Sequence, residues 1–408
     1  MKIIVSALSC NASQGSEGLV GYKTVEALSR VHQVTLLASP PAEIPPGVEW
    51  IPCNAQPCNF NEVGPDAWFR FELRQWRTVR RLRKTRKFDL IHKVTPAPLV
   101  NSTMLYLHGL PLIVGPVLVA QPVPASFEPL LRRPVSAPPR PKFHPGRVAS
   151  SVIRRVAARV NGAARHLDHA AVILLGMKEA WRHVPERHWS RCQFLSWSGI
   201  EHARFLPDAS ARHPTVVRLL FVGRLVPYKG VELLLRALAG ARKHHTFALS
   251  IVGTGDPVYT GFLRDLAAQL GLTDILTFVP AVSRTELLRF YQEADVFCFP
   301  TLCDTYGIAL LEAMSCRCAV LVSDTAGPQE IVAEGTGLKV ALTNPEQYVS
   351  DYAAALVRLA GDAPLRRQLG ARAREHILQH HDWERIGQQL LDIYHHLGSQ
   401  LDTHSRHQ

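Results

Sequence analysis

The sequence predicts an α/β protein built from two doubly wound parallel sheets. Short apolar runs alternate with longer helical segments in both halves of the chain, as in Lys2–Leu8 followed by Glu17–Arg30 and Val217–Val222 followed by Val231–Arg242. Strands that alternate with helices of ten or more residues form βαβ units and parallel sheets. The periodicity breaks near residues 200–215, so the two series predict two domains with a cleft between them.

Length and composition narrow the class of protein. The chain has 408 residues, enough for two domains that each have a core. Apolar residues make up 47% and charged residues 20%, which excludes a largely disordered chain. No stretch of 18 charge-free apolar residues occurs, so we expect no membrane-spanning helix. The run Ile3–Leu8 is too short for a signal peptide and predicts a buried first strand. The eight cysteines include no C-x-x-C pair, which fits reduced thiols in a cytosolic enzyme with no bound metal.

The remaining elements follow the same alternation. In the first half we expect strands at Gln33–Ala38, Asp89–His92, Leu112–Val114 and Ala171–Leu175, and a long helix at Asp66–Arg86. In the second half the expected strands are Phe247–Val252, Ile275–Val279, Val296–Pro300 and Ala319–Val322, with helices at Tyr259–Leu270, Arg284–Gln292 and Gly307–Ser315. After residue 345 the chain is predicted to be mostly helical.

The net charge of +12 is concentrated in the first half of the chain. Residues 1–205 carry 27 lysines and arginines against 13 aspartates and glutamates, whereas residues 206–408 carry 19 against 21. Nine basic residues lie between Arg70 and Lys87, interleaved with apolar side chains. A basic amphipathic helix is typical of contact with an anionic membrane surface. A solvated helix with its apolar stripe in the core explains the pattern equally well. Nucleic acid is a third and less supported partner, because no nucleic-acid module accompanies the charge.

The glycines after the first strand indicate a ligand near the start of a helix. Gly18 lies in the segment GSEGLVG, and glycine lets a ligand approach the backbone at a helix N-terminus. The segment is not G-x-G-x-x-G, and no acidic residue ends the second strand where a dinucleotide ribose would need one. An enzyme that transfers hydride is therefore disfavoured.

The second half carries a stronger signal for phosphate binding. After the strand that ends in LLFV come Gly223, Arg224 and Lys229, so two cations occupy one short loop at the carboxyl edge of a parallel sheet. Two cations in such a loop can converge on a pyrophosphate, although they can also simply solvate the loop. Gly253 and Gly255 in VGTG would let a base or a phosphate approach the backbone at the same edge.

Two carboxylates and a helix start complete the candidate site. Asp304 lies in a loop and Gly307 opens the next helix, where the backbone N–H groups near Tyr306, Gly307 and Ile308 would face an anion. Glu312 lies inside that helix among apolar residues, so we expect it to be buried and to have a partner. Carboxylates in these places suit bidentate hydrogen bonds to sugar hydroxyls.

These motifs resemble the donor-binding domain of retaining GT-B glycosyltransferases, in particular glycosyltransferase family 4 (glycosyl transferases group 1). The matching pieces are FVGRLVPYKG, LSIVGTGD, ADVFCFPTLCDTYGIALLEAMSC and DTAGPQEIV, in the order and spacing of the family. The resemblance implies the GT-B fold, two Rossmann-like domains that face an interdomain cleft. It implies an acceptor-binding domain over 1–205, a nucleotide-sugar-binding domain over 206–382, and a last helix at about 383–397 that crosses back onto the first domain.

The resemblance also implies roles for single residues. Arg224 and Lys229 match the pair that grips the donor diphosphate, and Glu312 matches the second carboxylate of the family's E-x7-E motif, which binds the ribose. Asp304 matches the first carboxylate, which contacts the transferred sugar, although glutamate is usual there. Gly18 matches a glycine that borders the phosphates. Further donor contacts are expected from the backbone at strand ends and at the helix start, namely Gly223, Gly253, Gly255, Val279, Tyr306, Gly307 and Ile308.

One family feature is absent from its usual place. Many relatives have a histidine after the acceptor-domain strand that here ends LIVGPV, whereas this chain has Gly115 and Pro116 there. His92 or His108 could serve instead, and His92 is a candidate catalytic residue together with Arg224, Lys229 and Asp304.

The sequence therefore predicts a retaining, hexosyltransferase-type enzyme that moves a sugar from a nucleoside diphosphate sugar to an acceptor hydroxyl. No D-x-D sequence is present, so we expect neither a metal nor another cofactor. The acceptor is expected to be a glycan or a lipid-linked glycan in surface polysaccharide or glycolipid assembly, and the basic first domain suits the inner face of the plasma membrane. A GT-B epimerase or phosphorylase-like enzyme and a catalytically inactive sugar-nucleotide-binding protein are the alternatives.

Overall fold

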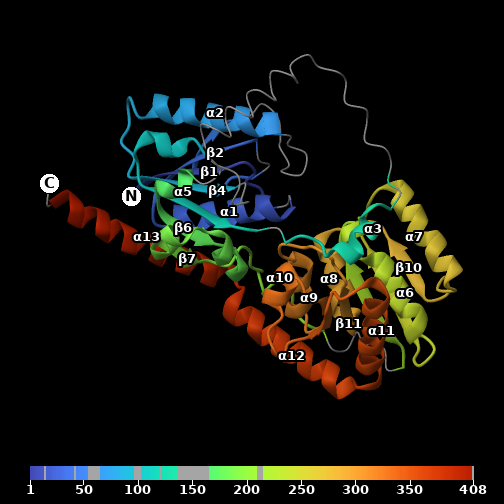
Figure 1. Cartoon of the computed structure of the whole chain (residues 1–408). Helices are drawn as coiled ribbons and strands as arrows, with labels where there is room; N and C mark the ends of the chain where they lie inside the picture. Colours follow the sequence, from blue (N-terminus) through green and yellow to red (C-terminus); the bar gives the residue numbers. More distant parts are fainter. Residues whose placement is uncertain are drawn as a thin grey trace, which may run out of the picture. The chain divides into compact units, whose positions relative to one another are not determined.

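The structure is a computed structural model of the chain. It describes residues 1–12, 15–40, 43–53, 65–95, 103–119, 121–133, 135, 165–208 and 215–406. The chain forms two compact units (Figure 1). The first unit is Met1–Val119 with Lys142–Ser198 and Trp383–Gln408, and the second is Ala120–Pro141 with Gly199–Asp382.

The first unit is built on a seven-stranded sheet in which every pair of neighbouring strands is parallel. The strand order is β3-β2-β1-β4-β5-β6-β7, so the order reverses between β1 and β4. The strands are β1 (Lys2–Ala7), β2 (Gln33–Ala38), β3 (Glu49–Pro52), β4 (Leu90–Thr95), β5 (Leu112–Val117), β6 (Ala170–Leu175) and β7 (Cys192–Phe194).

Helices lie on both faces of this sheet (Figure 1). They are α1 (Gly15–Ser29), α2 (Pro65–Leu82), η2 (Leu105–His108), α5 (Arg165–Asp168), η4 (Lys178–His183), η5 (Glu186–Arg191) and α13 (Trp383–Arg406). The last helix, α13, packs on α1, where Arg30 Nη1 lies 2.6 Å from a carboxylate oxygen of Glu384. The C-terminal helix is therefore part of the first unit.

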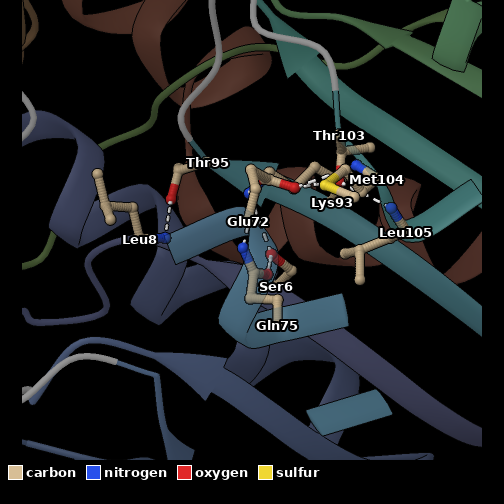
Figure 2. Close-up of polar contacts among 9 residues, drawn as sticks. All are labelled: Ser6, Leu8, Glu72, Gln75, Lys93, Thr95, Thr103, Met104 and Leu105. Atoms are coloured by element: carbon tan, nitrogen blue, oxygen red, sulfur yellow. Dashed lines mark hydrogen bonds and ion pairs between the residues drawn. The ribbon is translucent and has the colours of Figure 1, made fainter. Parts of the chain in front are cut away.

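Neighbouring residues of β4 point to opposite faces of the sheet, as the pleat requires. Lys93 points toward α2, where its ammonium lies 2.8 Å from Glu72 and 3.1 Å from the hydroxyl of Ser6 (Figure 2). The side chains of Lys93 and Glu72 are only 3% and 1% exposed. Glu72 also accepts hydrogen bonds from the hydroxyl of Thr103 at 2.7 Å and from the backbone N–H of Met104 at 3.2 Å. The buried ion pair therefore joins β1, β4, α2 and the start of η2.

The second unit is built on a six-stranded parallel sheet of the same kind. Its strand order is β10-β9-β8-β11-β12-β13, so the order reverses between β8 and β11. The strands are β8 (Val217–Val222), β9 (Phe247–Val252), β10 (Leu276–Val279), β11 (Val296–Phe299), β12 (Ala319–Ser323) and β13 (Leu338–Val340).

The second unit also contains helices. They are η3 (Ala125–Phe127), α3 (Glu128–Leu131), η7 (Pro227–Lys229), α6 (Val231–Ala241), α7 (Pro257–Gln269), α8 (Arg284–Glu293), α9 (Ile308–Ser315), α10 (Ala326–Ile331), α11 (Pro345–Gly361) and α12 (Ala363–His380). Local signals set several boundaries. Ser283 and Glu286 form a capping box at the start of α8, and Asp256 accepts two backbone N–H bonds at the start of α7.

One segment lies in a different unit from the one that the sequence predicts. We call Gln121–Arg133 the docking segment. Its position before residue 205 predicts that it belongs to the first domain, whereas the structure places it in the second unit. Phe127 is fully buried in the core of that unit, and its ring meets the ring of Tyr348 edge-on at 5.9 Å. Burial of this aromatic side chain accounts for the difference.

The basic helix α2 has its apolar side chains in the core. Phe71 and Val79 are fully buried, and Trp76 is half-buried under the guanidinium of Arg80. The basic side chains on the opposite face are exposed, as at Arg77 and Arg81. The side chains of Phe71 and Val79 are therefore not available for insertion into a bilayer, whereas the arginines on the opposite face are exposed. Among the described residues no helix combines the length and the low polarity that crossing a membrane requires.

The buried ion pair of the first unit leads to a stability prediction. Replacing Lys93 by methionine leaves the Glu72 carboxylate in the core without its counter-charge, so we expect Lys93→Met to lower the free energy of unfolding by about 3 to 5 kcal/mol. Urea denaturation measures this loss. The double variant Lys93→Met/Glu72→Leu should lose less than the sum of the two single variants. Unchanged stability of Lys93→Met would refute the account of this ion pair.

Candidate functional site

The second sheet has its topological switch point between β8 and β11, and in doubly wound sheets ligands bind at the carboxyl ends of the strands at such a point. Gly223 and Arg224 directly follow β8, and the segment that includes Asp304 and Gly307 follows β11. The strand order therefore brings together, at one sheet edge, the two segments that carry the predicted cations and carboxylates.

Lys229 and Asp304 meet across this switch point. The Lys229 ammonium forms a short ion pair with the Asp304 carboxylate, and their side chains are only 13% and 18% exposed. The same ammonium lies 5.2 Å from the centre of the Phe299 ring, the last residue of β11. The sequence predicts that both residues line one site, but it does not reveal that the two charges pair with each other.

Tyr228 was missed by the sequence analysis. Arg224 is exposed, and its Nη2 donates a hydrogen bond of 2.5 Å to the Tyr228 hydroxyl. The Tyr228 carbonyl accepts hydrogen bonds from the N–H of Leu302 at 2.8 Å and from the hydroxyl of Thr301 at 3.2 Å. Tyr228 therefore orients Arg224 and ties the segment after β8 to the segment after β11. An aromatic residue between the two cations of RLVPYKG was the available signal.

Gly230 explains how these segments come so close. Its φ is +70°, in the left-handed region that glycine favours, and a Cβ there would lie 1.9 Å from the carbonyl oxygen of Pro300. Any larger residue would separate the Lys229 segment from the segment that leads to Asp304. The close approach of the two charged residues therefore depends on this glycine.

The other predicted glycines have different roles. A Cβ on Gly253 would lie 2.0 Å from the carbonyl oxygen of Gly223, and one on Gly255 would lie 2.0 Å from that of Leu225. Gly253 and Gly255 are therefore required for close packing between two segments of the chain itself. The sequence predicts instead that the space at these two glycines serves a ligand. The N–H of Gly253 donates to the Val279 carbonyl at 2.9 Å, so that oxygen already has a partner. Gly223 differs, because a Cβ there would meet only the Phe221 ring at an ordinary 3.4 Å.

The start of α9 has no side-chain cap. Gly307 is the N-cap residue and makes no side-chain cap hydrogen bond, and Ile308 is the first helical residue. The positive end of the helix dipole is therefore available to an anion. Tyr306 precedes it and is buried, with its hydroxyl 3.0 Å from Nδ1 of His381. Gly307 and Ile308 therefore lie at the start of a helix, as predicted. The Tyr306 side chain instead lies in the core.

Glu312 lies in the second turn of α9 and is 6% exposed. Its carboxylate accepts a hydrogen bond of 2.7 Å from the Tyr291 hydroxyl, which is the partner that its burial requires. Burial raises the pKa of Glu312 to about 7, although the Tyr291 hydrogen bond opposes that shift. Burial and the hydrogen bond from Tyr291 therefore hold the Glu312 side chain in a fixed position within α9.

His92 does not fit the catalytic role that the sequence analysis assigned to it. It is fully buried in β4, with Nε2 2.8 Å from the Gly115 carbonyl oxygen and Nδ1 2.8 Å from the Tyr394 hydroxyl. Because a carbonyl only accepts, Nε2 carries the proton and Nδ1 accepts from tyrosine. Burial lowers the pKa of His92 to about 4, so it is neutral. His92 joins β4, β5 and α13 in the core.

The remaining positions of the first unit that the sequence singles out are His108, Gly115 and Gly18. His108 ends η2 and precedes β5, so it lies at the amino edge of the sheet, opposite the edge where ligands bind. Gly115 has a φ of +119°, and a Cβ there would lie 2.3 Å from the Leu174 carbonyl oxygen, which excludes a histidine at this position. Gly18 is buried in α1, where its carbonyl accepts from the N–H of Asn11 at 3.0 Å. Within the described part of the chain, no three His, Cys, Asp or Glu side chains are grouped so that they could hold a metal ion.

The raised pKa of Glu312 leads to a pH-dependent prediction. A folded-state pKa above the ordinary value means that the neutral carboxyl is favoured in the fold and that stability is lost as the pH rises through about 7. Relative to Glu312→Gln, which cannot ionise, the wild type should lose roughly 2 to 3 kcal/mol between about pH 5 and about pH 8. Urea denaturation at both pH values measures the difference. A Glu312→Gln difference that is the same at both pH values would contradict the account.

Known proteins share both the sequence pattern and the fold. Residues 205–376 match the family model described as glycosyl transferases group 1. The chain is 33% identical over 216 residues to the D-inositol 3-phosphate glycosyltransferase of Saccharomonospora viridis, covering 48% of each protein. It is 32% identical over 177 residues to an uncharacterized glycosyltransferase of Methanocaldococcus jannaschii, covering 43% of this chain and 44% of that protein. The matches span about half the length of these curated relatives.

Solved structures match nearly the whole chain at low identity. Sucrose-phosphate synthase from Thermosynechococcus elongatus is 19% identical with a TM-score of 0.69, and the match covers 98% of this chain and 99% of that one. Anabaena HepE in complex with UDP and glucose is 16% identical with a TM-score of 0.63, over 97% and 99%. With its two parallel-sheet α/β units, the chain has the GT-B fold of two Rossmann-like domains, as its sequence predicts.

Proposed function

We propose that the chain is a retaining glycosyltransferase that moves a sugar from a nucleoside diphosphate sugar to an acceptor hydroxyl. The observation that carries this proposal is the convergence of Arg224, Lys229, Asp304 and the uncapped start of α9 at the switch point of the second sheet. The match of residues 205–376 to glycosyl transferases group 1 includes all four and supports the proposal. Relatives named as glycosyltransferases, and a solved structure of the same fold in complex with UDP and glucose, support it further.

The chemistry follows from where negative charge develops. When the bond from the sugar to the diphosphate breaks, the leaving diphosphate gains charge, and Arg224, Lys229 and the α9 N-terminus would stabilise it. Removing one such interaction typically costs about 3 kcal/mol of transition-state stabilisation. Asp304 would then contact the transferred sugar, and Glu312 the ribose. Because the chain itself supplies these positive groups, the proposed reaction needs no bound metal.

Binding of the donor would change the pairing of Lys229. Its ammonium is paired with Asp304, and the side chain is only 13% exposed. A diphosphate that arrives at the switch point offers the ammonium more negative charge than one carboxylate, and it leaves the Asp304 oxygens available to sugar hydroxyls. The ion pair would therefore hold both side chains in place before the donor binds, which reduces the entropy lost on binding.

We further propose that the acceptor is an anionic or lipid-linked glycan at the inner face of the plasma membrane, as in surface polysaccharide or glycolipid assembly. The exposed basic face of α2, with side chains such as Arg77 and Arg81, supports this. Because the apolar stripe of α2 is buried, the proposed attraction to anionic headgroups is electrostatic.

A catalytically inactive sugar-nucleotide-binding protein is the second candidate. It is favoured by the first unit, where His92 is buried and neutral, His108 lies at the amino edge and Gly115 excludes a side chain. Calorimetry combined with product analysis separates the candidates. Donor binding without donor turnover supports the inactive protein, an epimerised or phosphorolysed product supports the other enzyme classes, and an acceptor glycoside with retained anomeric configuration supports the proposal.

The donor site is tested by a thermal-shift screen of UDP-, GDP- and ADP-sugars. We expect at least one donor class to raise the Tm of the wild type and to have no such effect on Arg224→Ala, because that variant lacks the exposed guanidinium at the switch point. Arg242→Ala is a matched control, because Arg242 lies at the end of α6 and pairs with Asp274. Equal shifts in the wild type and in Arg224→Ala would contradict the proposed site.

The membrane contact is tested by sedimentation with vesicles that contain anionic lipid. We expect binding that weakens as salt is added, because exposed charges are screened over a Debye length of about 10 Å at 0.1 M salt. The double variant Arg77→Glu/Arg81→Glu should bind less, whereas Lys243→Glu, at an exposed residue of the second unit, should bind as the wild type does. Absent or salt-insensitive binding would count against the contact.

A further inference from the structure

The docking segment, Gln121–Arg133, is attached to the second unit at several points along its length. Phe127 is buried in the core of that unit, and the hydroxyl of Ser126 donates to the Thr343 carbonyl at 3.2 Å. In Figure 1 the segment is recognised by α3, which lies among the elements of the second unit. These contacts fix the middle of the docking segment. Its two ends contact the elements that carry the candidate site.

Each end of the segment contacts an element that carries half of the Lys229–Asp304 ion pair. At the first end, the Cys303 thiol lies 3.0 Å from the Gln121 carbonyl oxygen, and Cys303 directly precedes Asp304. Toward the other end, α3 packs against η7, whose last residue is Lys229. The docking segment therefore touches the segments on both sides of the switch point.

A bidentate ion pair fixes the second end of the segment. Nε and Nη2 of Arg133 donate to the two carboxylate oxygens of Glu232 at 2.7 and 2.6 Å. Glu232 is 3% exposed and lies in the first turn of α6, directly after the Lys229 segment. The same carboxylate accepts from Nη2 of Arg236 at 2.9 Å, within α6 itself. Two arginines thus share one buried carboxylate, but only Arg133 connects it to the docking segment.

We infer that the docking segment is a positioning element of the proposed donor site, and that Arg133 is the positioning residue that holds it there. This inference rests on the proposed function for its ligand. Arg133 acts through α3 and η7 on Lys229 and makes no contact with the donor. Releasing Arg133 would let α3 move away from η7, so that the Lys229 ammonium and the Asp304 carboxylate would lose the fixed geometry that prepares them for a diphosphate.

The shared carboxylate provides a matched pair of variants. Arg133→Met and Arg236→Met each remove one arginine from Glu232, and each leaves the other in place, so neither leaves the buried carboxylate without a cation. We expect Arg133→Met to raise the Kd for the nucleoside diphosphate that the wild type binds most tightly, among UDP, GDP and ADP, by about tenfold. Titration calorimetry should show no such change for Arg236→Met. Equal changes in both variants, or none in Arg133→Met, would overturn the inference.

Hydrogen exchange tests the positioning without any nucleotide. Amides in residues 223–230 and 300–307 should exchange faster in Arg133→Met than in the wild type, and at the wild-type rate in Arg236→Met. Unchanged exchange in Arg133→Met overturns the inference whether or not a nucleotide binds. Faster exchange in a chain that binds none of the three nucleotides supports the positioning and contradicts the proposed donor site, so the two failures are distinguishable.

Discussion

The short ion pair between Lys229 and Asp304 is the interaction on which the account of this protein depends. Strand order alone brings their two segments to the switch point of the second sheet, but it does not fix how the side chains meet. Three further contacts do so: the Tyr228 carbonyl bonded to Thr301 and Leu302, and Gly230 packed against Pro300. The candidate site thus lies where two segments meet. Contacts of their backbones hold these segments together in addition to the ion pair between Lys229 and Asp304.

Opposite charges at such a junction combine stability with function. A lysine that is mostly buried without a counter-charge would be costly, and Asp304 supplies that charge. The anion that the proposal places there would compete for the ammonium, while the exposed guanidinium of Arg224 and the uncapped start of α9 remain accessible. The docking segment, which follows β5 in the chain, adds to this arrangement because it contacts both of the segments that carry the ion pair.

Much of the fold could be predicted from the sequence, because long apolar periodicity marks central strands and helices. The predicted strands Gln33–Ala38, Val217–Val222 and Phe247–Val252 have the observed bounds. Edge strands such as Cys192–Phe194 were missed, because three half-exposed residues carry no periodic pattern. In the site, residue types and spacing pointed to Lys229, Asp304 and the start of α9. They could not reveal that Gly253 and Gly255 serve internal packing, that His92 faces the core, or that residues 121–133 belong to the second unit. Each of these depends on contacts between segments far apart in the sequence.

The central claim is that the switch point of the second sheet holds a pyrophosphate between two cations and a helix start. A crystal structure of the chain with a bound nucleoside diphosphate tests this most directly. The account predicts diphosphate oxygens within hydrogen-bonding distance of the Lys229 ammonium and the Arg224 guanidinium, next to the backbone N–H groups that follow Gly307. A diphosphate bound elsewhere, with the Lys229–Asp304 contact unchanged and Arg224 still directed only at Tyr228, would contradict it.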